Sequence, residues 1–155
     1  MCFKFEAPIL REGSDMKAIR FHEYGDANVL RYEDVDLPVP ASGQVRIRVA
    51  GTSFNGVDGN IRAGFMQGPM PLTLPHIPGL DVAGTVDELG EGVSGVKVGD
   101  AVVGFLPFVE DGASAEYVLA SADGLALAPT SIPLADAAAF PLVALTARQA
   151  LFDHA

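Results

Sequence analysis

Residues 75–105 decide the fold of this chain, and they read PHIPGLDVAGTVDELGEGVSGVKVGDAVVGF. Residues 82–86 favour a β-strand, and the glycines of residues 90–92 can adopt the positive φ that a turn needs. Valines alternate with other side chains over residues 96–98, and a Gly-Asp pair then turns the chain into the apolar residues 101–106. The stretch therefore predicts strand, turn and strand, followed by a further strand.

Other short strands are predicted on both sides of this stretch. They cover residues 16–21, 30–37, 44–50, 114–120 and 125–127, and glycines and prolines separate them. Many short strands with turn residues between them are typical of an all-β barrel or sandwich. We expect a mainly β fold, namely a partly open antiparallel barrel.

Two arginines alternate with valine and isoleucine in the predicted strand 44–50. Arg46 and Arg48 would face solvent there, where they favour solubility and protect a sheet edge. A role in binding phosphate is the alternative.

The glycine pattern resembles that of a known superfamily. P-G-x-D-x-A-G-x-V, then G-x-G-V and V-G-D-x-V, are similar to the signature of the medium-chain dehydrogenase/reductase superfamily, in its N-terminal GroES-like catalytic domain. The resemblance covers Met16 to Ala155. Leu80 stands where the zinc alcohol dehydrogenases place a histidine, and an aliphatic side chain cannot bind a metal. The resemblance implies the zinc-independent quinone oxidoreductase (ζ-crystallin-like) branch, with no metal site.

Three segments are predicted along the chain. Residues 1–15 have no sustained period and form a leader or disordered arm, and residues 16–130 form the GroES-like catalytic domain. Residues 131–155 are helical by composition, and Pro141 divides them into two helices. No G-x-G-x-x-G motif lies between a strand and a helix, so we expect these helices to lead to a dinucleotide-binding domain outside this sequence.

Composition excludes several classes of partner. The chain has 155 residues, 49% of them hydrophobic, and a formal net charge of −10, which argues against nucleic-acid and anionic-membrane partners. Cys2 is the single cysteine, so neither an internal disulfide nor a cysteine zinc lobe can form. No membrane span or signal peptide is evident, and a cytoplasmic location is expected.

The candidate catalytic residues lie in the segment N-x-x-D-x-x-x-R-x-G, which resembles the segment of the zinc-independent reductases where zinc enzymes have C-x-x-D. Asn55 takes the place of the metal-binding cysteine, and its amide can donate to a substrate carbonyl or contact the nicotinamide ribose. The alternative is that Asn55 caps a turn. Asp58 is the second catalytic candidate, although a structural role, capping the next turn or holding Arg62, is the favoured interpretation. Arg62 either faces a cofactor phosphate or organises its loop.

Three further residues have open roles. Asp81 stands at the position of the acid that lies beside the metal ligands in the superfamily's zinc enzymes, and without a metal it would pair with a basic residue or with backbone N–H groups. His76 is expected at the surface. Thr146 matches the position that faces the nicotinamide pocket, where it can bond the cofactor amide or, instead, the carbonyl one turn back in its own helix.

The resemblance implies a function for the whole protein. We expect NADPH-dependent, zinc-free hydride transfer to a small-molecule carbonyl, enone or quinone substrate by a homodimer, with this chain alone inactive. We also predict that this chain self-associates through apolar side chains of its last helix, namely Leu142, Leu145, Leu151 and Phe152. The alternatives are the enoyl-reductase unit of a polyketide or fatty-acid synthase and a non-enzymatic GroES-like oligomerisation or binding module.

Overall fold

The computed structural model describes residues 2–4 and 15–153. Its strands are β1 (Cys2–Lys4), β2 (Asp15–Phe21), β3 (Leu30–Asp36), β4 (Gln44–Ser53), β5 (Asp81–Leu89), β6 (Ala101–Phe105), β7 (Tyr117–Ser121) and β8 (Leu125–Leu127). Its α-helices are α1 (Gly56–Arg62) and α2 (Pro141–Arg148), which a π-helical turn, η4 (Gln149–Asp153), extends. Short 3-10 helices are η1 (Ala27–Val29), η2 (Ala122–Gly124) and η3 (Leu134–Ala139).

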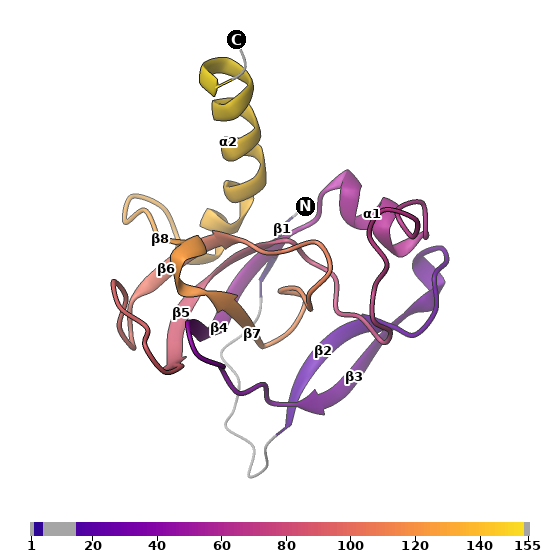
Figure 1. Cartoon of the computed structure of the whole chain (residues 1–155), viewed down its shortest axis with the longest axis horizontal. Coiled ribbons are helices and arrows are strands. Elements are labelled where there is room, and N and C mark those ends of the chain that lie inside the picture. The colour runs from indigo at the N-terminus through magenta and orange to yellow at the C-terminus, as the bar shows by residue number, and fades with distance from the viewer. Residues whose placement is uncertain (1, 5–14, 154–155) are drawn as a thin grey trace.

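The strands form two antiparallel sheets, seen side by side in Figure 1. The larger has the order β1-β4-β5-β6-β8, and β7 pairs with the first half of β4 while β1 pairs with its second half. The smaller sheet is the hairpin β2–β3. The mainly β, partly open architecture is confirmed, because the described strands form two antiparallel sheets that do not close into a barrel.

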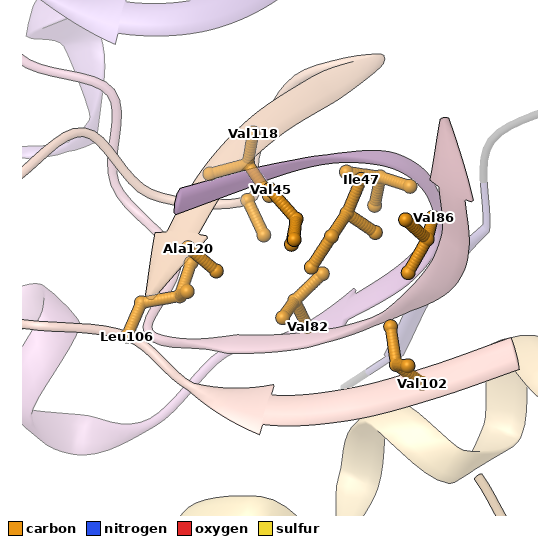
Figure 2. Packing of buried hydrophobic residues seen from close by; sticks show 10 residues of the cluster. Val45, Ile47, Val82, Val86, Val102, Leu106, Val118 and Ala120 are labelled. Carbon is orange, nitrogen blue, oxygen red and sulfur yellow. The ribbon is translucent and has the colours of Figure 1, made fainter. Parts of the chain in front are cut away.

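The core lies inside the curve of the larger sheet. Val45, Ile47 and Val49 alternate along β4 and are buried, as the period-2 pattern predicted. Figure 2 shows Val45 and Ile47 meeting side chains such as Val82 from β5 and Val118 from β7, and Val49 belongs to the same cluster. Burying one such side chain contributes about 1.5–3 kcal/mol, so this cluster is what holds the sheet in its curve.

The predicted edge-protecting role of the arginines is wrong for Arg46. β4 is a central strand, and the guanidinium of Arg46 donates to Asp87 at 2.7 Å and lies 2.7 Å from Glu88 on β5. It also lies over the ring of Tyr117, 5.6 Å from its centroid. The side chain therefore joins the outer faces of three neighbouring strands.

Two strand boundaries differ from the prediction. Residues 96–98 lie in a loop, because β5 pairs directly with β6 and leaves residues 90–100 outside the ladder. Gly92 and Gly99 have the positive φ that this loop requires. Residues 51–53, predicted as loop, continue β4 because β1 pairs with them.

The N-terminal arm is described only in part. Residues 2–4 form β1, an edge strand on β4 that the sequence did not indicate. Residues 5–14 of the predicted arm lie outside the described residues.

The chain ends in the predicted pair of helices. η3 packs its alanines against β4 and β5, and Pro141 begins α2. Figure 1 shows α2 standing away from the sheets, and most of its apolar side chains are exposed.

Candidate active site

Asp81 is the centre of the candidate site. It is the first residue of β5 and only 1% exposed. Its Oδ2 accepts hydrogen bonds from the hydroxyl of Ser53 and, at 2.8 Å, from Nδ2 of Asn55. Its Oδ1 accepts from the backbone N–H of Leu142 at 2.8 Å. One buried carboxylate therefore joins the end of β4, the start of α1 and the first turn of α2.

Of the two pairings proposed for Asp81, the structure gives the backbone N–H. The partner comes from α2, 61 residues further along the chain. The hydroxyl of Ser53 and the amide of Asn55 complete the set of donors, and no sequence pattern indicated these residues as a group.

Asn55 and Asp58 form a capping box at the N-terminus of α1. The backbone N–H of Asn55 donates to Oδ2 of Asp58 at 2.7 Å. Burial raises the pKa of the Asp58 carboxyl, while hydrogen bonds from the backbone of Asn55 and Gly79 act in the opposite direction. Both capping interpretations from the sequence therefore describe real contacts.

Arg62 ends the same helix and faces another loop. Its Nη1 donates to the carbonyl oxygen of Gly25 at 2.8 Å, which fits the loop-organising alternative. The same side chain lines a cavity of about 170 Å³ beneath α1. The cavity wall is mostly apolar, from Ile19, Leu30, Phe54 and Pro78, with polar groups from Ser53, Asp58 and Arg62 among others.

Gly79 closes this cavity where a larger residue would not fit. Its φ is +108°, and a Cβ there would lie 3.0 Å from both Ser114 and Thr52. The glycine of the P-G-x-D pattern thus lets the loop before β5 pass close to the floor of the site.

Thr146 lies apart from this cavity. It is exposed on α2, and its hydroxyl donates to the carbonyl oxygen of Leu142 at 2.7 Å, as in the local alternative. Because Leu142 is also bonded to Asp81, Thr146 is one helical turn from the centre of the site.

The expected surface position of His76 is wrong. The residue is 4% exposed and packs edge-on against Phe21, with ring centroids 5.5 Å apart. Its Nδ1 lies 3.6 Å from Oδ1 of Asp111, and burial lowers the pKa of the imidazole. The backbone of His76 pairs with that of Phe21 in an isolated β-bridge, and this pairing places the histidine in the interior. The residues next to His76 in the sequence do not indicate this pairing.

No metal-binding set is present among the described residues, since no three His, Cys, Asp or Glu side chains gather there. Leu80, at the position of the zinc enzymes' histidine, is buried.

Residues 41–130 match the family model of the alcohol dehydrogenase GroES-like domain. The chain belongs to this family. It is 38% identical over 144 residues to a chloroplast envelope quinone oxidoreductase homolog of Arabidopsis thaliana, covering 92% of this chain and 44% of that protein. The predicted membership of the medium-chain dehydrogenase/reductase superfamily, with quinone oxidoreductases as relatives, is confirmed.

Solved structures resemble this domain closely. The quinone oxidoreductase from Coxiella burnetii has a TM-score of 0.80 and 35% identity, covering 88% of this chain and 44% of that one. A mycobacterial protein complexed with NADPH has a TM-score of 0.78 and 35% identity, covering 88% of this chain and 40% of that one. The chain thus spans less than half the length of these relatives.

The helices in the described part of the chain are all too short or too polar to cross a membrane.

Proposed function

We propose that this chain is the catalytic-domain part of a zinc-independent, NADPH-dependent reductase that transfers hydride to a quinone, enone or other carbonyl compound. The observation that carries the proposal is the Asn55 amide, which the buried carboxylate of Asp81 holds in place. Phe54 and Asp58, on either side of Asn55 in the sequence, line a mostly apolar cavity. An apolar cavity with a few placed polar groups suits a small carbonyl compound. In this reading residues 16–130 are the catalytic domain and residues 131–155 lead to a dinucleotide-binding domain.

The residues present fit a nicotinamide nucleotide in part. Asn55 is partly exposed and offers an amide, and Arg62 offers a cation suited to a phosphate. The Thr146 hydroxyl already donates within α2, so only its oxygen remains to accept a hydrogen bond. When bound, the nicotinamide supplies the hydride, and these side chains orient it.

We assign Asp58 a structural role and keep Asn55 as the residue that contacts the ligand. A buried carboxylate that accepts the Asn55 N–H and caps α1 sets where Asn55 lies, and it has no need to take part in proton transfer. A homodimeric whole protein and a cytoplasmic location remain parts of this proposal.

A chimera tests the function. This chain would replace the matched part of the Coxiella burnetii quinone oxidoreductase, and NADPH oxidation would be followed with 1,4-naphthoquinone, cyclohex-2-enone and an aldehyde. We expect turnover of at least one of them, and a loss of about tenfold or more with Asn55→Ala. A folded chimera that binds NADPH but turns over none of the three would contradict the proposal.

A matched control separates the site from the fold. Asn28→Ala removes an amide from an exposed turn, where its Nδ2 donates to Oδ2 of Asp26 at 3.2 Å, and should leave turnover unchanged.

A further inference from the structure

The side-chain amide of Asn55 has a defined orientation in this structure, with its NH2 end toward Asp81. Its Nδ2 lies 2.8 Å from Oδ2 of Asp81 and 3.4 Å from the hydroxyl oxygen of Ser53. An ionised carboxylate can only accept hydrogen bonds, so the end of the amide that faces Asp81 must be the NH2 group.

Asp81 cannot easily turn away from this contact. Its other oxygen is engaged by the N–H of Leu142, and Ser53 donates to the same oxygen as Asn55. The carboxylate is 1% exposed, so losing one of these partners would leave a buried polar group unpaired. Hydrogen bonds from three chain segments therefore hold the Asp81 carboxylate in place, and this carboxylate is the acceptor for the Asn55 amide.

The opposite end of the amide is its oxygen. Asn55 is partly exposed whereas Asp81 is buried, so the NH2 group points inward. A carbonyl oxygen has two lone pairs, and capping α1 uses at most one of them. The remaining lone pair can accept a hydrogen bond from a ligand.

We propose that Asp81 is a positioning residue that turns the NH2 group of Asn55 inward, so that Asn55 meets a ligand as a hydrogen-bond acceptor. The inference rests on the proposed function for the class of ligand. The ligand group against Asn55 is then a hydroxyl or an N–H, as on the ribose or carboxamide of a nicotinamide nucleoside. A substrate carbonyl, which only accepts, cannot bond to the Asn55 oxygen.

Nuclear magnetic resonance on this chain tests the orientation without any ligand. In the wild type we expect a scalar coupling across the hydrogen bond between Nδ2 of Asn55 and the carboxyl carbon of Asp81. Asp81→Asn should shift the resonances of the Asn55 NH2 protons, because a neutral amide is a weaker acceptor than a carboxylate. Asp87→Asn, on the same strand but paired with Arg46, should leave them unchanged. Wild-type Asn55 NH2 protons without this coupling, or unchanged in Asp81→Asn, would overturn the inference, and the wild-type measurement stands even if that variant does not fold.

Two probes then test the ligand half. Both probes are added to the chimera, because this chain alone is expected to bind the nucleotide weakly. NADP+, whose ribose and carboxamide carry donors, should shift the Asn55 side-chain carbonyl carbon, while cyclohex-2-enone, which has no donor, should leave that carbon in place. A larger shift of that carbon with the enone than with NADP+ would overturn the orientation of the amide. A chimera that binds NADP+ without a change in any Asn55 signal refutes the ligand half of this inference. The chimera assay decides the proposed function separately.

Discussion

At the scale of single residues, the buried polar side chains of this domain each have a specific partner. Thr52 donates to the carbonyl oxygen of Asp81 at 2.7 Å, and Asp81 itself receives three donors. Asp58 caps α1, and His76 lies beside Asp111. No buried side-chain nitrogen or oxygen of the described residues lacks a partner. Substitutions at these positions should therefore act through unpaired groups as well as through lost contacts.

His76 should make stability depend on pH. Burial lowers its folded pKa below the usual 6.5, with Asp111 acting weakly in the opposite direction. Below that value the unfolded chain binds the proton more readily than the folded chain does. The free energy of unfolding should therefore fall as the pH drops from 6.5 through the lowered folded pKa.

Urea unfolding at about pH 7.5 and about pH 5.5 measures this slope. His76→Phe, which keeps an aromatic ring against Phe21, should flatten it. His22→Gln, at an exposed histidine bonded to Glu33, should retain it. Equal slopes in the wild type and in His76→Phe would rule out His76 as the cause.

Gly84 should be intolerant of a side chain. A Cβ at this position on β5 would lie 2.3 Å from the carbonyl oxygen of Arg48 on β4. Gly84→Ala should cost about 1–3 kcal/mol by forcing the two strands apart. Gly124→Ala has open space around its Cβ and should change stability by less than about 0.5 kcal/mol. Thermal unfolding of the two variants compares them, and similar midpoints would contradict the packing argument.

At the scale of elements, α2 and η4 differ from the rest of the fold because they project from it (Figure 1). Leu145, Leu151 and Phe152 are exposed there, and a groove of about 360 Å³ lies between α2 and the edge formed by β6 and β8. Exposed apolar surface of this kind favours association.

The element should drive self-association of this chain. We expect sedimentation of the wild type to show a concentration-dependent dimer and Leu151→Glu/Phe152→Glu to be monomeric. Phe65→Glu is the control, because Phe65 is 78% exposed and Phe152 is 76% exposed, but Phe65 lies in the loop after α1. A wild-type chain that stays monomeric at high concentration would contradict this expectation.

At the scale of the whole molecule, the chain spans less than half of its relatives, and its candidate contacts to a nicotinamide nucleotide are few. We therefore expect this chain alone to bind NADPH weakly or not at all. Isothermal titration calorimetry measures the affinity. Micromolar binding by the isolated chain would show that the domain holds the nucleotide by contacts that we have not identified.

The sequence by itself determined the family and most of the strands and turns, because period-2 valines and positive-φ glycines act through local backbone geometry. It did not indicate β1, the end of β4 or the loop at residues 96–98, which depend on strand pairing. It also placed Asn55 and Asp58 at a helix start, since capping acts over three residues. Only the tertiary structure decided that Asp81 joins Asn55 to Leu142, that His76 is buried and that Arg46 lies on a central strand. Those outcomes depend on which strands pair across long sequence distances and on which side chains are thereby buried. A local sequence pattern determines neither the pairing nor the burial.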